Sequence, residues 1–216
     1  MNDIESGNQA QYWDRVAWAK TFTLPVNLPL LRTHLPLDSK ILDYGCGYGR
    51  TCQELAACGY STITGVDSSS EMIRRARQMN PGLRFDVHTA SDLPYAENTF
   101  DAILLIAVLT CIPAGEDQRS LVGTLKRVLR PAGILHVVDY VLQTDERNRQ
   151  RYARYADEFG VYGVFRLEEG GIFRHHSLDW IKVLLADFEL VDLSFVDVRT
   201  MNGHPARAFQ YSGRYG

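Results

Sequence analysis

Five short apolar segments alternate along the chain with segments whose apolar residues recur at helical spacing. Strands that alternate with helices form a mostly parallel sheet with helices on both faces. The longest apolar run, 102–109, has no polar position, as expected for a strand buried on both faces. The pattern therefore predicts a Rossmann-like α/β fold, with strands at 40–44, 61–66, 84–87, 101–107 and 134–139.

The helical segments carry recognisable start and stop residues. Ser68, with Glu71 three residues later, resembles a capping box, and Asn-Pro-Gly at 80–82 ends the helix that follows. Ser177 is expected to cap a later helix. Further helices are predicted at 8–20, at 50–58 and around 121–129, the last closed by Pro-Ala-Gly at 131–133. The segment 21–36, with three prolines, is predicted to be irregular.

Two strand patterns lie close to the C-terminus, at 190–198 and 206–211. The Asn-Gly-His-Pro sequence between them is a turn signal. These strands are expected to form a hairpin, so that one of them runs antiparallel to the rest of the sheet.

The segment 141–176 interrupts the alternation. It reads as a helix over about 144–159, followed by a hairpin across Glu-Glu-Gly-Gly at 168–171. An insertion after the fifth strand lies over the carboxyl edge of the sheet, where open α/β sheets bind ligands, so we expect a lid there. We predict a single domain, 1–216, made of an N-terminal cap (1–36), a core (37–140 and 177–216) and this lid insertion.

Composition limits the functions to consider. The net charge of −3 and the sequence pI of about 6.1 disfavour non-specific nucleic-acid binding, so no nucleic-acid partner is expected. The four cysteines form no Cys-x-x-Cys pair, and we expect no metal site. The N-terminal residues contain no apolar signal core and the longest apolar run is too short to span a bilayer. A cytoplasmic location without membrane contact is predicted, and the oligomeric state is left open.

The sequence ILDYGCGYGR at 41–50 places a glycine-rich turn between a strand and a helix. Glycines permit close approach of the backbone to a ligand, and a helix N-terminus favours an anionic group. The spacing differs from the G-x-G-x-x-G dinucleotide fingerprint. Asp43 would repel a pyrophosphate but would favour an ammonium or sulfonium group. A plain strand–helix turn is the alternative interpretation.

Two further acidic positions follow strands. Asp67 ends the second strand, where a carboxylate can accept hydrogen bonds from both hydroxyls of a ribose. Capping of the next helix is the alternative, although Ser68 fits that role. Asp92 and the backbone N–H of Leu93 have the chemistry to bind an adenine, and an ordinary loop aspartate is the alternative.

The ordered segments ILDYGCGYGR, GVDSS, ASDLPYAENTFDAILL and LKRVLRPAGILHVVD resemble the motifs of class I S-adenosylmethionine-dependent methyltransferases of the small type 11 kind. The resemblance runs from about 40 to 139. It implies a seven-stranded sheet with a reversed C-terminal hairpin. It also implies S-adenosylmethionine as cofactor, S-adenosylhomocysteine as product and a small-molecule methyl acceptor as partner.

The resemblance also implies roles for individual residues. Asp43, Gly45, Cys46 and Gly47 would surround the methionine moiety, and the backbone at Leu105 and Ile106 would meet its amino group. The ribose would lie against Asp67, with Ser68 and Met72 nearby, and the adenine against Asp92 and Leu93. Thr110 and Cys111 occupy a position where relatives often carry other polar residues or histidine, so their role is left open.

Methyl transfer needs an aligned acceptor and, for some acceptors, a general base. His175 and His176, at the end of the predicted hairpin, are the candidates for catalysis or substrate contact, with a structural role as the alternative. Tyr12, Trp13 and Phe22 are candidates for the substrate side of the cap. Arg174 belongs to a set of insertion arginines and aromatic residues that would grip an anionic or aromatic substrate, although a solvated helix packed on its tyrosines explains the same pattern.

Three other functions are weighed against a small-molecule methyltransferase. A protein or nucleic-acid methyltransferase would need a broad basic groove, and 105–108 lacks the Asn/Asp-Pro-Pro-Tyr motif of amino-directed nucleic-acid methylation. A catalytically inactive binding module would have a blocked path to the methyl group. A nicotinamide-dependent oxidoreductase is disfavoured by the glycine spacing and by Asp43.

Overall fold

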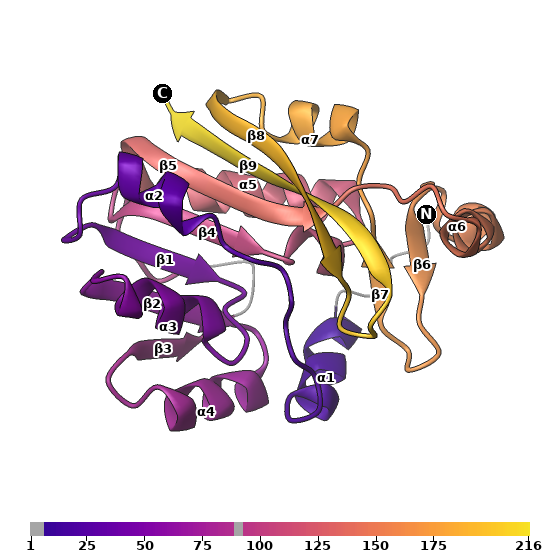
Figure 1. Cartoon of the computed structure of the whole chain (residues 1–216), viewed down its shortest axis with the longest axis horizontal. Coiled ribbons are helices and arrows are strands. Elements are labelled where there is room, and N and C mark those ends of the chain that lie inside the picture. The colour runs from indigo at the N-terminus through magenta and orange to yellow at the C-terminus, as the bar shows by residue number, and fades with distance from the viewer. Residues whose placement is uncertain (1–6, 89–92) are drawn as a thin grey trace.

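The computed structural model describes residues 7–88 and 93–216, which form a seven-stranded sheet with helices around it (Figure 1). The strand order is β3-β2-β1-β4-β5-β9-β8. β1 to β5 pair in parallel, whereas β9 is antiparallel to both β5 and β8. The Rossmann-like α/β fold with a reversed C-terminal hairpin is therefore confirmed. The strands are β1 Lys40–Tyr44, β2 Thr62–Asp67, β3 Arg84–Val87, β4 Phe100–Ile106, β5 Leu129–Tyr140, β8 Phe188–Arg199 and β9 Pro205–Tyr215.

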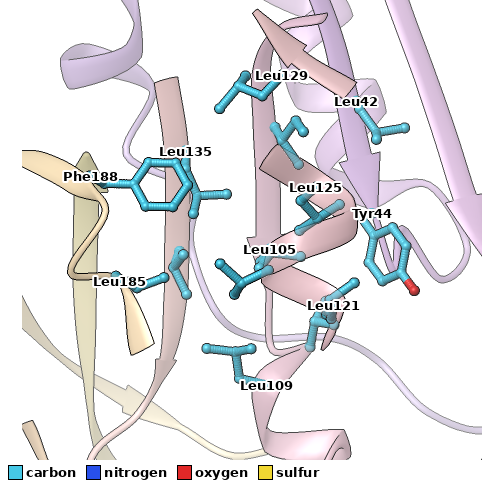
Figure 2. Close-up of a cluster of buried hydrophobic side chains, with 14 of the residues drawn as sticks. Leu42, Tyr44, Leu105, Leu109, Leu121, Leu125, Leu129, Leu135, Leu185 and Phe188 are labelled. Carbon is cyan, nitrogen blue, oxygen red and sulfur yellow. The ribbon is translucent and has the colours of Figure 1, made fainter. Parts of the chain in front are cut away.

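Helices pack on both faces of this sheet because its central strands are apolar on both sides. On one face, Leu42 and Leu105 meet the apolar stripes of α5 and α7, and Figure 2 shows Leu121 and Leu125 of α5 against them. On the other face, Ile41 and its neighbours meet α2, α3 and α4. The helices are α1 Gly7–Val16, α2 Leu28–His34, α3 Arg50–Ala57, α4 Ser70–Met79, α5 Gly115–Val128, α6 Glu146–Phe159 and α7 Leu178–Leu184, with a short 3-10 turn, η1, at Leu109–Cys111. Within the described ranges, no helix is long and apolar enough to cross a membrane.

β1 lies between β2 and β4, so the strand order reverses at this point of the sheet. Connections from neighbouring strands leave in opposite directions at such a switch point, which opens a crevice at their carboxyl ends. The loop after β1, the end of β2 and the segment after β4 all reach this edge. The topology therefore places the candidate residues of three strands around one crevice.

The insertion, residues 141–176, contains α6 and a separate two-stranded sheet formed by β6 (Val164–Arg166) and β7 (Ile172–Arg174). Asp145 caps α6 by accepting a hydrogen bond from the backbone N–H of Asn148. The strands pair antiparallel, with Phe165 opposite Phe173. The helix and hairpin predicted here are confirmed.

Several local predictions need correction. The segment predicted to be irregular at 21–36 contains α2, because the Asn27 side chain caps it and Pro29 lies in the first turn, where a missing N–H costs little. The first helix ends at Val16 and not at 20. The helix predicted around 121–129 ends at Val128, and Pro-Ala-Gly at 131–133 lies within the irregular start of β5, where Ala132 has a φ of 61°.

The predicted capping box at Ser68 is also wrong by one residue. Ser69 is the N-cap of α4, and its side chain accepts a hydrogen bond from the backbone N–H of Met72. Asp67 accepts a hydrogen bond from the N–H of Ser69, which delays the start of the helix by one position. The serines at 68, 69 and 70 look alike in the sequence, so this register depends on Asp67.

Candidate functional site

A cavity of about 1010 Å³ lies at the carboxyl edge of the sheet. One wall comes from the core, including Asp43, Gly45, Asp67 and Ile106. The opposite wall comes from α1, the insertion and the turn between β8 and β9. Typical ligand pockets measure about 300–1,000 Å³, so this cavity has room for a cofactor and a second small molecule.

The glycine loop after β1 needs glycine for both backbone and packing reasons. Gly45 and Gly47 have φ values of 71° and 53°, which disfavour other residues. A Cβ at Gly45 would lie 2.5 Å from Cγ2 of Val108, and one at Gly47 would lie 2.0 Å from Cε2 of Phe22. The N–H groups of Gly45 and Cys46 donate to the carbonyl of Val66, at 2.8 and 2.9 Å. The loop is therefore held against β2, beside the cavity.

Asp43 lines the cavity from below this loop and is almost fully buried. Burial raises the pKa of this carboxyl to about 7, although the thiol of Cys52, which donates to it at 3.2 Å, and the charge of Arg50 lower it. A buried carboxyl of this kind gains most from a cationic ligand, which restores its charged form. Its surroundings fit the ammonium or sulfonium expected from the sequence.

Both carboxylate oxygens of Asp67 accept backbone hydrogen bonds within the part of the chain that the structure describes. Oδ2 accepts the N–H of Gly47 and Oδ1 accepts the N–H of Ser69, both at 2.9 Å. Burial raises the pKa of Asp67, and these backbone hydrogen bonds oppose that effect. A carboxylate has about four lone-pair sites, so both oxygens retain acceptor capacity toward the cavity that Asp67 lines. Two adjacent acceptors are what a vicinal diol such as a ribose requires.

The other residues expected at the cofactor divide into two groups. Cys46, Ser68, Met72 and Ile106 line the cavity. Side chains that do not line it include those of Leu93 and Leu105, which are buried in the core, where the carbonyl of Leu93 accepts from Arg127. Gly47 faces the ring of Phe22 and does not line the cavity, but its N–H donates to Asp67, which does. Asp92 lies outside the described residues.

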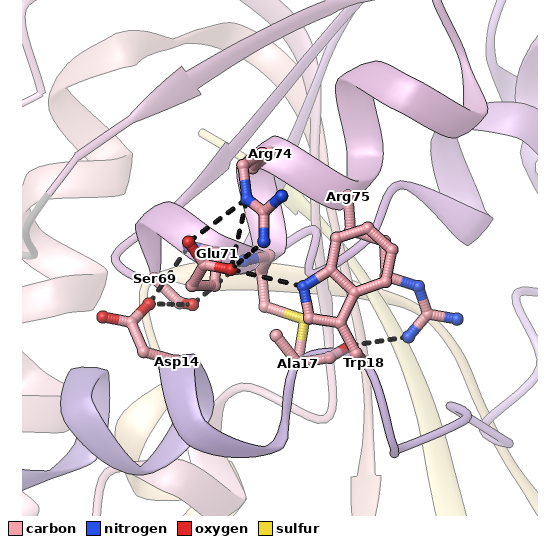
Figure 3. A network of polar contacts seen from close by, with 8 residues as sticks. Asp14, Ala17, Trp18, Ser69, Glu71, Arg74 and Arg75 are labelled. Carbon is pink, nitrogen blue, oxygen red and sulfur yellow. Dashed lines mark hydrogen bonds and ion pairs between the residues drawn. The ribbon is translucent and has the colours of Figure 1, made fainter.

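The N-terminal helix α1 is fixed on α4 by a polar network (Figure 3). Oδ1 of Asp14 accepts from the Ser69 hydroxyl at 2.6 Å and from the Glu71 N–H at 3.1 Å. The indole of Trp18 donates to Glu71 at 3.2 Å. This docking brings the adjacent Trp13 to the cavity.

A layer of aromatic side chains forms part of the cavity wall opposite Asp43 and Asp67. Trp13 contacts Phe22 and Phe173 edge to face, with ring centroids 5.8 and 6.1 Å apart, and all three rings line the cavity. Tyr12 does not line it. Its ring is buried against the rings of Trp13 and Phe173, with centroids 5.1 and 5.8 Å away, and its hydroxyl donates to Glu169 at 3.2 Å.

The end of the insertion hairpin explains which of its predicted residues reach the cavity. Backbone pairing continues beyond β7, because the N–H of His176 donates to the carbonyl of Tyr140 at 3.0 Å. Side chains of an extended segment alternate between its faces. Phe173 and His175 line the cavity, whereas Arg174 and His176 do not. The period of two therefore separates the two adjacent histidines.

His175 is buried at the cavity and held by Tyr152. Its Nδ1 lies 2.5 Å from the Tyr152 hydroxyl oxygen, which also accepts the N–H of Gln143 at 3.2 Å. Burial, with the nearby charge of Arg151, holds the pKa of His175 well below its ordinary value. The imidazole is therefore neutral at physiological pH, as a proton acceptor must be.

His176 and Arg174 need correction as site residues. Nε2 of His176 lies 3.0 Å from the amide nitrogen of Gln118, and burial lowers the pKa of His176 to about 3. Arg174 lies 4.7 Å from the ring centroid of Trp180 and donates to the carbonyl of Pro113. Both side chains stabilise the packing behind the cavity and do not face it.

Several cavity residues were not predicted from the sequence. Gln9 donates to the carbonyls of Cys111 and Ile172, which joins α1 to the insertion. The turn at 200–204 reaches the cavity because β8 runs parallel to β5 and ends at the same sheet edge. That direction was readable from the predicted hairpin, whereas the Gln9 contact joins residues more than 100 positions apart.

Comparisons with known proteins agree with this geometry. A family model described as "Methyltransferase domain" matches residues 42–137. O-methyltransferase rstn1 of Aspergillus nomiae is 28% identical over 170 residues, which cover 76% of this chain and 69% of rstn1. O-methyltransferase resE of Aspergillus sclerotiorum is 28% identical over 210 residues, which cover 92% of this chain and 74% of resE. Other relatives are matched over 35% to 57% of their length.

A solved structure gives the same assignment at the level of the fold. A crystal structure described as an S-adenosylmethionine-dependent methyltransferase from Methanosarcina mazei superposes with a TM-score of 0.81 at 28% identity. The match covers 87% of this chain and 97% of that one. The fold and the crevice at its switch point define an α/β protein that binds a ligand at the carboxyl edge of the sheet. In sequence and in fold, the chain matches class I S-adenosylmethionine-dependent methyltransferases. S-adenosylmethionine is its cofactor and S-adenosylhomocysteine the product.

Proposed function

We propose that this protein transfers a methyl group from S-adenosylmethionine to an oxygen atom of a small molecule. The observation that carries the proposal is one continuous cavity of about 1010 Å³, which has Asp43 and Asp67 on one wall and the aromatic residues with His175 on the other. A cofactor and an acceptor bound in one cavity are held close together, which removes much of the entropic barrier to their reaction.

The core wall would hold the cofactor. Asp43 would face the positively charged methionine end, together with the backbone of the glycine loop and of Ile106. Asp67 would accept the ribose hydroxyls through the acceptor capacity that Gly47 and Ser69 leave free. Met72 and Ser68 would line that end of the cavity. The adenine role of Asp92 and Leu93 stays a prediction.

The opposite wall would hold the acceptor. When bound, S-adenosylmethionine supplies an activated methyl group on its sulfonium. The aromatic layer of Trp13, Phe22 and Phe173 excludes water and positions the acceptor. His175 accepts the proton of the acceptor hydroxyl at Nε2, while its Nδ1–H donates to the hydroxyl oxygen of Tyr152 and fixes the orientation of the ring.

Oxygen is favoured over other acceptor atoms because rstn1 and resE are both described as O-methyltransferases. A neutral histidine can also accept the proton of an alcohol or phenol as general base. The single-domain organisation and the cytoplasmic location stay predictions from the sequence.

The test compares His175→Gln with the wild-type protein in a methylation assay. Transfer of labelled methyl groups from S-adenosylmethionine to a panel of small phenols and alcohols would be measured, together with the affinity for S-adenosylhomocysteine. We expect turnover to fall by about 10²–10⁴-fold, the usual contribution of a general base, with unchanged cofactor affinity.

His34→Gln is the matched control, since His34 lies at the end of α2 and does not line the cavity. Full turnover by the His175→Gln variant would show that His175 is not the general base. Cofactor binding without transfer to any member of the panel by the wild-type protein would favour the inactive binding module.

A further inference from the structure

Two arginines of the insertion reach the cavity from the same side of α6. Arg147 and Arg151 are one helical turn apart, and both line the cavity. The guanidinium carbon of Arg151 lies 3.5 Å from the ring centroid of Phe165. Its Nε is buried and has no hydrogen-bond partner in the part of the chain that the structure describes.

The neighbouring carboxylates pair with other cations, and Arg151 has none of them as an ion-pair partner. Arg166 pairs with Glu158 at 2.9 Å, and Glu169 is taken by Lys20 at 3.0 Å. Arg147 lies 4.0 Å from Asp145. Among the described residues, no carboxylate lies within ion-pair distance of Arg151. A partly buried cation with no anionic partner is costly, and burial lowers the pKa of Arg151 accordingly.

We propose that the methyl acceptor is an aromatic hydroxy acid whose carboxylate is bound by Arg151. The proposal rests on the proposed function, because it assigns the acceptor of that same cavity. The guanidinium presents its donors in a planar fork that matches a carboxylate, and such charge-assisted hydrogen bonds are among the strongest in proteins. Stacking on the rigid ring of Phe165 orients the guanidinium of Arg151.

The aromatic part of the acceptor follows from the shape of the same region. Phe165 carries Arg151 on its ring and has His175 against it, with the His175 and Phe165 centroids 5.1 Å apart. The ring of Phe165 therefore contacts both the proposed carboxylate-binding group and the proposed base. Trp13 and Phe173 add edge-to-face partners for a planar ligand. A molecule with an acidic group and a hydroxyl on one aromatic frame satisfies both positions.

A different use of Arg151 would be to stabilise the reacting oxygen itself as a phenolate. That arrangement requires no carboxylate on the acceptor. The two cases differ in how the protein treats a hydroxy acid and its primary amide, since both carry the same phenol and only the acid carries the anion.

The experiment titrates 4-hydroxybenzoate, 3-(4-hydroxyphenyl)propanoate and the primary amides of both into the protein saturated with S-adenosylhomocysteine, by calorimetry. At least one acid is expected to bind about 10- to 100-fold more tightly than its amide, the gain typical of hydrogen bonds to a charged group. In Arg151→Met this preference should disappear, with unchanged affinity for S-adenosylhomocysteine.

Arg149→Met is the matched control, because Arg149 lies on the same helix, pairs with Glu146 at 3.1 Å and does not line the cavity. It should keep the full preference for the acid. Arg151→Gln serves as a second neutral variant if Arg151→Met fails to fold, and the comparison of acid with amide in the wild-type protein needs no variant.

The proposal is overturned if acid and amide bind equally, if neither acid binds while S-adenosylhomocysteine does, or if the preference survives the loss of Arg151. Failure of the proposed function gives a different result. In that case S-adenosylhomocysteine and the acid bind, and the preference for the acid is lost in Arg151→Met, but no methyl group is transferred to the acceptor hydroxyl.

Discussion

Asp67 accepts hydrogen bonds from Gly47 and Ser69 and still lines the cavity. Its place at the end of a strand was readable from the sequence, whereas its bonds to the glycine loop were not, because they join residues twenty positions apart. One carboxylate thus shapes the loop, sets the start of α4 and offers acceptors to a ligand. Ser69, and not Asp67, caps the helix, so the alternative interpretation of Asp67 as the cap is wrong.

Replacing Asp67 by alanine removes the proposed acceptors of the ribose hydroxyls. Affinity for S-adenosylhomocysteine is expected to fall by about 2–3 kcal/mol, the scale of hydrogen bonds to a charged group. Calorimetry on Asp67→Ala would measure this loss. Asp86→Ala is the control, since Asp86 lies on the neighbouring strand β3, pairs with Arg84 and does not line the cavity. Equal affinities in both variants would exclude the ribose role.

The lowered pKa of His175 predicts a pH profile. A histidine with the ordinary pKa of about 6.5 is roughly three quarters protonated at pH 6 and would lose activity as the pH falls. Because the pKa of His175 is held well below the ordinary value, this loss of the base form is shifted to lower pH, and kcat should fall less between pH 8 and pH 6 than with an ordinary histidine. The assay uses an acceptor whose own pKa lies outside this window. A decline in kcat with a midpoint near 6.5 would contradict the lowered pKa of His175.

Among the elements of the insertion, the alternation of side chains at 173–176 decides which residues reach the cavity. The sequence showed His175 and His176 as an equivalent pair, and only the backbone pairing with Tyr140 fixes which one reaches the cavity. The same holds for the serines at 68–70, where Asp67 sets the cap. Short-range patterns predicted that these elements exist, but tertiary contacts set their register to the residue.

The prolines before the sheet led to a wrong prediction. They predicted an irregular segment at 21–36, yet α2 begins at Leu28 with Pro29 in its first turn and Asn27 as its cap. Proline is disfavoured in the interior of a helix but is tolerated in its first turn. An Asn-x-Pro sequence read as a helix start would have identified α2.

The glycine loop supplies a test at this scale. Gly47→Ala places a methyl group at a φ of 53° and 2.0 Å from Phe22, so it should disturb the loop and weaken binding of S-adenosylhomocysteine at least about tenfold. Gly123→Ala is the matched control, since a Cβ at this position of α5 meets nothing within 4 Å.

The control should leave affinity unchanged and raise the free energy of unfolding by about 0.5–1 kcal/mol, because alanine favours a helix. Thermal unfolding and calorimetry on both variants would measure these effects. Normal affinity in Gly47→Ala would show that the loop tolerates a side chain and does not approach the ligand closely.

Across the whole molecule, the cavity is assembled by contacts that no local pattern contains. Lys20 pairs with Glu169, and Gln9 reaches the carbonyl of Ile172, so α1 and the insertion close over the sheet together. The sheet, its strand order and the crevice follow from the alternation of strands and helices and from the resemblance. The aromatic layer and the arginines of α6 come from segments far apart in the sequence. The sequence could therefore predict that such residues lie near the site, but not which of them line the cavity.

The proposed function depends most on the binding of an adenosyl cofactor in the cavity. Isothermal calorimetry with S-adenosylmethionine, S-adenosylhomocysteine and NAD tests this directly. We predict micromolar binding of the first two and no binding of NAD, because Asp43 favours a cation and disfavours a pyrophosphate. Binding of NAD, or of neither adenosyl ligand, would contradict the account.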